Sequence, residues 1–252
     1  MTEAQTAAPA VTEARDRLII ALDVESANEA RRRVNELNEF AGAFKVGLQL
    51  FTSAGPTFVQ ELCDSGVRVF LDLKFHDIPN TVAKAAIEAA RLGVWMFNLH
   101  ASGGNEMMHT AVSEVDEFCQ KRSIRRPIMI GVTVLTSSAD DTLRQIGIER
   151  TAEEQVSRLS VLAKESGLDG VVASPVECRR IRAECGREFV IVTPGVRPIN
   201  ASNDDQKRVM TPSDAIRAGA DHVVIGRPIT AATNPTVAAQ EILREIAEAD
   251  NA

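Results

Sequence analysis

The sequence predicts an α/β protein that folds as a single (β/α)₈ barrel, the TIM-barrel architecture. Short apolar runs rich in β-branched residues alternate with segments of helical periodicity, and eight such units follow one another along 252 residues. That length and that alternation are typical of a (β/α)₈ barrel. A doubly wound open sheet is the competing architecture. The first strand, however, runs into Leu22-Asp23-Val24-Glu25, without the glycine-rich phosphate loop that such sheets carry there.

Start and stop signals mark the first four units. Ser26 and Glu29 form the pattern of a capping box ahead of the first helix, while Pro56 begins the second helix and Gly66 ends it. The third helix is rich in alanine and ends near Gly93. The predicted strands of this half cover residues 17–21, 43–48, 68–73 and 94–99.

The second half repeats the same alternation. A polar loop follows the fifth strand, and Thr151 with Glu154 then forms another capping-box pattern. Ser174 and Thr211 precede the helices that follow the sixth and seventh strands. The predicted strands cover residues 127–133, 169–173, 188–193 and 221–225, and the last helix covers about 235–249.

Composition excludes several classes of protein. Residues 1–14 are expected to be a mobile N-terminal tail and residues 15–252 the barrel, with no apolar run long enough for a membrane span and no secretory signal pattern. The four cysteines lack paired spacing, which is typical of reduced thiols in a cytoplasmic protein. A net charge of −7 argues against nucleic acid as the partner, because binding a phosphate backbone needs a broad basic face.

Charged residues gather where strands are expected to end. Asp72 and Lys74 are two residues apart at the end of the third strand, so on an extended strand their side chains point to the same side. Lys45 comes from the neighbouring strand, and Asp77 lies just beyond. A lysine held between carboxylates stays protonated and is a candidate proton donor. Taken alone, the same residues also fit a surface cluster of salt bridges.

The carboxyl ends of barrel strands meet at one face, which carries the active site in (β/α)₈ enzymes. Convergence of Lys45, Asp72 and Lys74 from neighbouring strands therefore favours an active site over a surface cluster. The residues expected at that face are Asp23, Lys45, Asp72, Lys74, His100, Thr133, Ser174, Arg197 and Arg227.

Two glycine–arginine pairs predict a phosphate site. Thr193-Pro-Gly-Val-Arg197 follows the seventh strand and Val224-Ile-Gly-Arg-Pro-Ile229 the eighth, where many barrels bind phosphate. Glycine lets backbone N–H groups approach an anion, and arginine can fork onto it. The long polar segment 198–210 is typical of a lid, from which Gln206 can reach a phosphate. Turns with surface arginines are the alternative.

Six motifs together resemble those of the orotidine 5′-phosphate decarboxylase family, in the branch common in bacteria. The resemblance runs from Leu18 to about Ala238, and the D-x-K-x-x-D core is its most specific part. The motifs are Ala21-Leu-Asp23, Lys45-Val-Gly47, Asp72-Leu-Lys-Phe-His-Asp-Ile-Pro-Asn-Thr81, Thr133-Val-Leu-Thr-Ser137, Thr193-Pro-Gly-Val-Arg197 and Ile225-Gly-Arg-Pro228.

The resemblance implies that the chain converts orotidine 5′-phosphate to uridine 5′-phosphate and CO₂, the last step of de novo pyrimidine nucleotide biosynthesis. It implies Lys74 as the proton donor to C6, Asp72 beside the departing carboxylate, and a network completed by Lys45 and Asp77. It also implies a homodimer in which Asp77 and Thr81 reach the partner's site. The substrate contacts implied are Asp23 and Thr81 at the ribose hydroxyls, Ser137 at the pyrimidine, and Arg197, Gln206, Gly226 and Arg227 at the 5′-phosphate, with Lys45 as a further substrate contact.

No organic cofactor and no metal are expected, since no cofactor motif is visible and the four histidines lack ligand spacing. Catalysis is then expected to rest on fixed charge, and His76 receives no role. Three alternatives remain open. They are a magnesium-dependent sugar-phosphate barrel enzyme of the hexulose-phosphate synthase or ketogulonate-phosphate decarboxylase type, a Schiff-base aldolase using Lys45 or Lys74, and a non-catalytic phosphate-ligand sensor.

Overall fold

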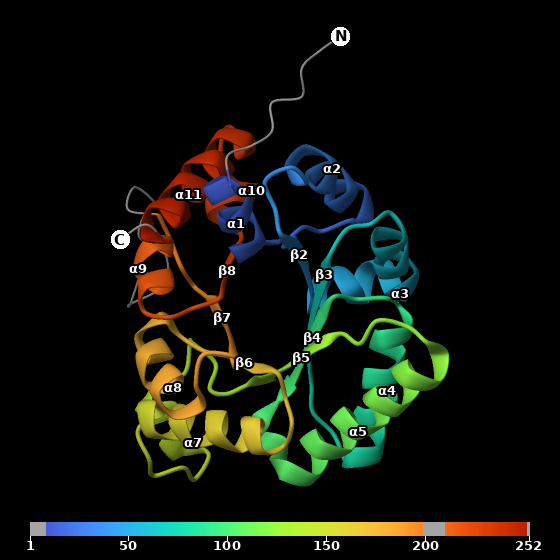
Figure 1. The fold of residues 1–252 in the computed structure, drawn as a ribbon, viewed down its shortest axis with the longest axis vertical. Helices are drawn as coiled ribbons and strands as arrows, with labels where there is room; N and C mark the ends of the chain where they lie inside the picture. Colours follow the sequence, from blue (N-terminus) through green and yellow to red (C-terminus); the bar gives the residue numbers. More distant parts are fainter. Residues whose placement is uncertain (1–8, 199–209, 251–252) are drawn as a thin grey trace.

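The predicted strands close into a barrel. In the computed structural model, which describes residues 9–198 and 210–250, eight parallel strands pair in sequence order, and β8 pairs with β1. Figure 1 shows the helices as a ring outside the strands. The strands are β1 (Leu18–Ala21), β2 (Ala43–Gly47), β3 (Val69–Phe75), β4 (Met96–His100), β5 (Ile128–Val132), β6 (Gly170–Val172), β7 (Val190–Pro194) and β8 (His222–Ile225). The predicted (β/α)₈ barrel is confirmed.

Helices between the strands return the chain from the end of each strand to the start of the next, while α1 precedes β1 and α10 and α11 follow β8. The longer ones are α1 (Pro9–Arg17), α2 (Ala27–Leu37), α3 (Leu48–Asp64), α4 (Pro79–Arg91), α5 (Gly104–Arg122), α7 (Ala152–Glu165), α8 (Cys178–Cys185) and α11 (Pro235–Asp250). The shorter ones are η1 (Ala101–Gly103), α6 (Asp140–Gln145), η2 (Pro175–Glu177), α9 (Pro212–Arg217) and α10 (Arg227–Thr230).

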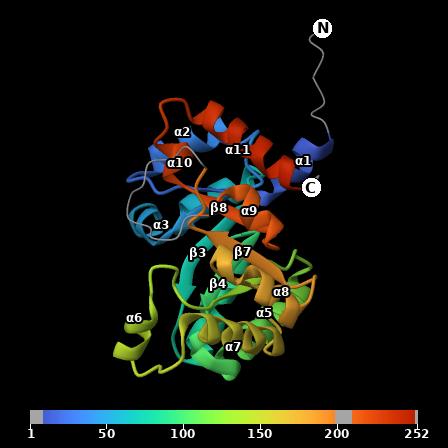
Figure 2. The same ribbon diagram turned by 90° about the vertical axis from the view of Figure 1, so that its left-hand side faces the viewer.

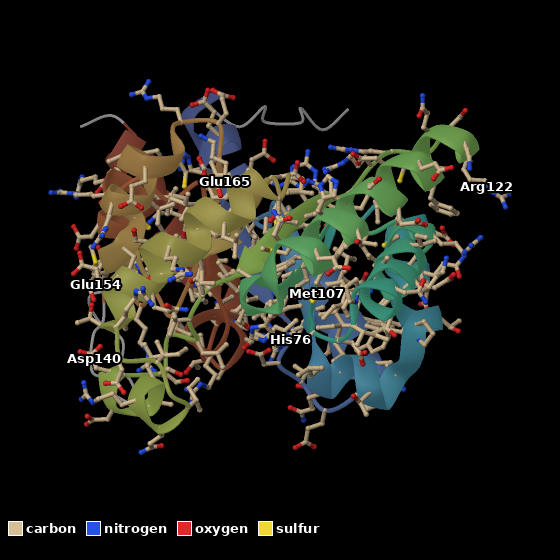
Figure 3. All side chains as sticks on the ribbon, turned by 90° about the horizontal axis from the view of Figure 1, so that it is seen from below. His76, Met107, Arg122, Asp140, Glu154 and Glu165 are labelled. Carbon is tan, nitrogen blue, oxygen red and sulfur yellow. The ribbon has the colours of Figure 1, made fainter. Side chains whose placement is uncertain are left out.

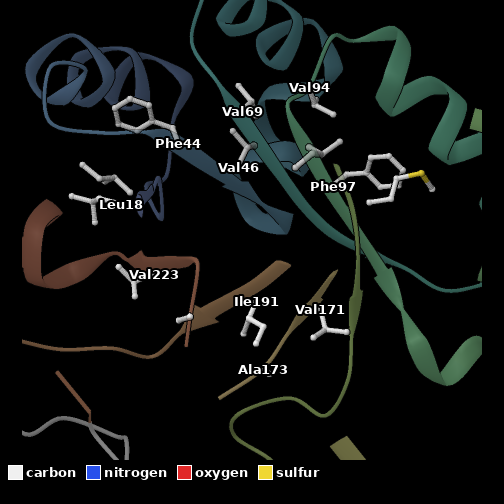
Figure 4. Packing of buried hydrophobic residues seen from close by; sticks show 14 of the residues in the cluster. Leu18, Phe44, Val46, Val69, Val94, Phe97, Val171, Ala173, Ile191 and Val223 are labelled. Carbon is white, nitrogen blue, oxygen red and sulfur yellow. The ribbon is translucent and has the colours of Figure 1, made fainter. Parts of the chain in front are cut away.

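Both faces of the sheet are buried, which is why the strands read as nearly continuous apolar runs. Along β1, Ile19 belongs to a cluster inside the barrel with Phe70, Met96 and Ile130. Leu18, on the other side of the sheet, belongs to the larger cluster between strands and helices, part of which Figure 4 shows around Phe44, Val46, Val69, Phe97 and Ile191. The core therefore has two layers, and it holds the strand ends rigidly in place.

The N-terminal boundary differs from the expectation of a tail through residue 14. Helix α1 begins at Pro9 and packs against α11 (Figure 1), and Ala14 is fully buried. Polar contacts as well as apolar ones hold α1 against the barrel. The Arg15 guanidinium donates to the carbonyls of Asn38 and Ala41, and Arg68 pairs with Asp16 at 3.0 Å. Residues 1–8 of the predicted tail lie outside the described residues.

Helical structure also extends beyond the predicted segments. Helix α3 begins at Leu48, directly after β2, and so starts eight residues before the predicted start at Pro56. Gly55, with a φ of 75°, interrupts the helix and kinks it just before Pro56. Helix α6 lies in the segment expected to be a polar loop, and Figure 2 shows it standing out from the ring. The Thr151–Glu154 capping box is confirmed, whereas at the start of α2 one half of the pattern forms, in which the Ser26 hydroxyl accepts from the Glu29 N–H.

In the part of the chain that the structure describes, no helix is both long and apolar enough to cross a bilayer.

Candidate active site

Charged side chains meet at the carboxyl ends of β1, β2 and β3. Lys45 Nζ lies 3.2 Å from Asp23 Oδ1 and 3.4 Å from Asp72 Oδ2. Lys74 Nζ lies 2.6 Å from Asp72 Oδ1. Asp72 therefore stands between two ammonium groups, and Lys45 between two carboxylates. The predicted convergence of Lys45, Asp72 and Lys74 is confirmed.

The backbone that carries Asp72 and Lys74 is irregular. The register of β3 against β4 shifts between the pairs Leu71↔Phe97 and Phe75↔Leu99, so that β3 bulges there. Lys74 has a φ of 54°, in the left-handed region, which costs a residue with a side chain about 1–2 kcal/mol. The simple alternation expected from the sequence is therefore interrupted, and the Lys74 ammonium reaches Asp72 from a bulged backbone.

Asn98, on β4, joins the cluster from the side of the bulge. Its Nδ2 donates to Asp72 Oδ1 at 2.7 Å, and its Oδ1 accepts a hydrogen bond from the Lys74 backbone N–H at 2.8 Å. The side chain is 1% exposed. Sequence reasoning missed Asn98. The available signal was a single amide within the apolar run of β4, where a buried polar group needs partners.

The ion cluster keeps Asp72 ionised. Its side chain is only 14% exposed, and burial alone would raise its pKa. The nearby ammonium groups of Lys45 and Lys74 and the hydrogen bonds from Lys74 and Asn98 outweigh burial, so the pKa of Asp72 lies below the ordinary carboxyl value. Two unit charges about 4 Å apart attract by about 4 kcal/mol at an effective dielectric constant near 20, so each pair is a strong constraint on geometry.

A cavity of about 170 Å³ opens beside the cluster. Both lysines, Asp23 and Asp72 line it, together with Leu22 and residues 47–50, where β2 passes into α3. A Cβ at Gly47 would lie 3.0 Å from Lys45 Nζ, so a glycine there leaves room for the ammonium group. The charged groups thus face a space that can hold a small ligand.

The carboxyl end of β8 adjoins the same cluster. A Cβ at Gly226 would lie 3.1 Å from Asp23 Oδ2, which places the start of α10 next to Asp23. Arg227 follows at the first position of α10 and is exposed. Arg197 lies beyond β7, where its backbone N–H donates to Met210 at 3.2 Å. Gln206 lies outside the described residues.

Other predicted residues do not join the cluster. Thr133 is buried and donates to the Val172 carbonyl at 2.9 Å, which ties β5 to β6, and Ser174 caps η2. Both contacts are structural. Asp77 accepts from the Ile78 N–H at 2.7 Å near the start of α4, and Thr81 and Ser137 are exposed.

Two histidines lie close to each other near Lys74. The rings of His76 and His100 are 5.2 Å apart, and Figure 3 shows His76 near Met107 of α5. Burial lowers the pKa of His100, as do His76 and Lys74, while Asp72 opposes the shift. Within the described residues, no group of three or more His, Cys, Asp or Glu side chains is arranged to hold a metal ion.

Comparison with known proteins gives consistent matches. The family model described as "Orotidine 5′-phosphate decarboxylase / HUMPS family" matches residues 16–242. A protein of Syntrophotalea carbinolica named orotidine 5′-phosphate decarboxylase is 57% identical over 239 residues, which cover 95% of this chain and 98% of that protein. One of the same name from Moorella thermoacetica is 55% identical, over 92% of this chain and 93% of that protein. The crystal structure of the Lactobacillus acidophilus orotidine 5′-phosphate decarboxylase superposes with a TM-score of 0.81 at 36% identity, over 91% of this chain and 98% of that one.

The pH dependence of the free energy of unfolding tests the ion cluster. The pKa of Asp72 is lower in the folded protein than in the unfolded chain, so its ionised form stabilises the fold above about pH 4, and this contribution is lost as the pH falls through the folded-state value. In Asp72→Asn, the free energy of unfolding should fall less steeply between about pH 4 and pH 2 than in the unmodified protein. Urea denaturation at a series of pH values measures the slopes.

The exposed Asp64 provides the control, because Asp64→Asn should leave the slope unchanged. Equal slopes in all three proteins would contradict the assignment.

Proposed function

The chain belongs to the orotidine 5′-phosphate decarboxylase / HUMPS family, and on that premise we propose that it converts orotidine 5′-phosphate to uridine 5′-phosphate and CO₂. The enzyme is a carboxy-lyase of pyrimidine biosynthesis. The observation that carries the proposal is the alternating cluster of Lys45, Asp72 and Lys74 facing one cavity at the carboxyl ends of the barrel strands. In (β/α)₈ enzymes that face holds the reacting groups.

The reaction needs a group that stabilises and then protonates a carbanion. In the proposed mechanism the bond from C6 of the pyrimidine to the carboxylate carbon breaks, CO₂ leaves, and the electron pair stays on C6. The Lys74 ammonium stabilises this developing charge, transfers a proton to C6 and regains one from water. Its contact with Asp72 at 2.6 Å supports this role, because the carboxylate holds the ammonium group in place before the substrate arrives.

Asp72 has a second part in the proposal. It lies near the departing carboxylate of the substrate, and the repulsion between two like charges is relieved as CO₂ leaves. A low pKa suits this role, since a protonated Asp72 would exert no repulsion. Lys45, whose ammonium group contacts both Asp23 and Asp72, keeps the network electrically balanced, and it contacts the substrate together with Asp23 at the ribose hydroxyls.

The phosphate is proposed to bind beyond β7 and β8. Gly226 and Arg227 follow β8 beside Asp23, so a nucleotide whose ribose contacts Asp23 extends its 5′-phosphate toward them. Arg197, Gln206, Gly226 and Arg227 are the proposed phosphate contacts, and Ser137 is proposed to contact the pyrimidine. Binding energy from this distant group can be used to lower the barrier at C6.

We also propose that the active protein is a homodimer. Asp77 and Thr81 do not reach the cluster of their own chain, and both are exposed at the start of α4. Ile78 between them is 67% exposed, and Leu48 at the cavity is 56% exposed. A second copy that covers these apolar side chains would bring its Asp77 and Thr81 to the neighbouring site.

The proposed location of the protein is the cytoplasm, and the four free cysteines are consistent with it.

The direct test is loss of orotidine 5′-phosphate absorbance with purified protein and excess chelator. Turnover should be unchanged by the chelator, because every group proposed to act on the substrate belongs to the protein chain itself. Activity that vanishes with chelator and returns with Mg²⁺ would instead support the magnesium-dependent alternative. Binding of the nucleotide without turnover would support a sensor.

Lys74→Ala separates chemistry from binding. The variant should lose turnover by about 10⁴-fold or more, because the charge and the proton donor are both removed. Uridine 5′-phosphate should still bind within about tenfold of the unmodified protein, since the phosphate contacts remain. Steady-state kinetics and calorimetry measure the two effects. Full activity in this variant would refute the role of Lys74.

Mixing of two inactive variants tests the shared site. If each site takes Lys74 from one subunit and Asp77 from the other, a dimer of Lys74→Ala with Asp77→Ala contains one intact site. Random exchange should therefore restore about one quarter of the activity. A mixture of Lys74→Ala with Asp72→Ala is the matched control, because both changes fall on the same side of the interface and no intact site forms. Recovery in the control, or none in the test mixture, would argue against sharing.

A further inference from the structure

We propose that Asn98 is a positioning residue, whose amide holds the Lys74 backbone and the Asp72 carboxylate in the arrangement that decarboxylation needs. This inference rests on the proposed function. Asn98 is not among the residues that line the cavity, and its side chain bonds to the Asp72 carboxylate and the Lys74 backbone, so it acts through these two residues.

The register of the sheet creates the need for such a group. Between the pairs Leu71↔Phe97 and Phe75↔Leu99, β3 advances four residues while β4 advances two. Asn98 is therefore the one residue of β4 that stands opposite the bulge. Regular ladder bonds are disrupted there, and the backbone N–H of Lys74 needs another acceptor. The Asn98 side chain supplies it at 2.8 Å.

The second hydrogen bond of Asn98 links the Lys74 backbone to the Asp72 carboxylate. Asn98 Nδ2 donates to the same Asp72 oxygen that contacts Lys74 Nζ, at 2.7 Å and 2.6 Å respectively. When Lys74 moves toward a substrate carbon, Asp72 loses part of that contact, while the bond from Asn98 remains. Because Asn98 is buried and held at both ends of its amide, it fixes the carboxylate throughout the reaction.

The amide is suited to this place because it donates and accepts without carrying a charge. The charged and titratable groups around it are Asp72 and Lys74, which it contacts, Lys45, which contacts Asp72, and His100, which interacts with Lys74, Asp72 and His76. A carboxylate at position 98 would still accept from the Lys74 N–H, but it would repel Asp72. Once protonated, it could donate to Asp72 and imitate the amide.

Two variants and a control test this role. Asn98→Leu removes both bonds at similar size and should lower kcat by about 10²-fold, with KM changed by less than about threefold, because misplaced reacting groups slow the chemical step. Asn98→Asp should be similarly slow near pH 8 and should recover relative to the unmodified protein as the pH falls toward about 5, because protonation restores the donor. Asn98→Leu should show no such recovery.

Ser160→Ala is the matched control for loss of a buried polar bond. Ser160 is fully buried on α7, in the outer ring of helices, and donates to the Val156 carbonyl at 2.8 Å within the same helix. This variant should lose stability and keep kcat and its pH profile. If Asn98→Leu does not fold, the pH profile of Asn98→Asp decides. Unchanged kcat in the Asn98 variants, or a profile for Asn98→Asp parallel to that of the unmodified protein, would overturn the proposal.

A crystal structure of Asn98→Leu separates this inference from the proposed function. The Lys74 backbone should leave the left-handed region, and its Nζ should move away from Asp72. If the unmodified protein shows no turnover of orotidine 5′-phosphate, the function fails, but this structure still tests the positioning. If φ of Lys74 and its contact with Asp72 are retained, the positioning fails even in an active enzyme.

Discussion

The arrangement depends on the contact of one carboxylate with two ammonium groups. Asp72 is mostly buried and stays ionised because Lys45 and Lys74 lie within 3.4 Å of its oxygens. Removal of one partner would leave a charge in a medium that solvates it poorly, so the three groups hold one another in a fixed geometry. A rigid charge pattern of this kind is what electrostatic catalysis requires, because the groups need no reorganisation at the moment of reaction.

The barrel provides the frame for that pattern. Parallel strands bring their carboxyl ends to one face, and the two apolar layers on either side of the sheet prevent β2 and β3 from moving apart. Within this frame, β3 departs from its register beside β4 in the segment that carries Lys74. The strain of a left-handed lysine is tolerated because Asn98 satisfies its N–H from the neighbouring strand.

Asp23 connects the two functional ends of the proposed site. It contacts Lys45 on one side and adjoins Gly226 at the end of β8 on the other. In the proposed binding mode, a nucleotide spanning this distance contacts the charge cluster with its base and the region of Arg227 with its phosphate. Binding energy gained at the far end can thereby be used for the chemistry at the near end.

The sequence by itself determined the barrel, the order of its units and the charged motifs at the strand ends. Those features are local or periodic. Alternation of apolar runs, the capping box at Thr151 and the spacing of Asp72 and Lys74 can all be read along the chain. Tertiary structure alone decided the packing of α1 onto α11, the bulge at Lys74, the recruitment of Asn98 and the structural use of Thr133. Each depends on which residue stands opposite on a neighbouring strand or helix, and that register is fixed by packing of the whole barrel.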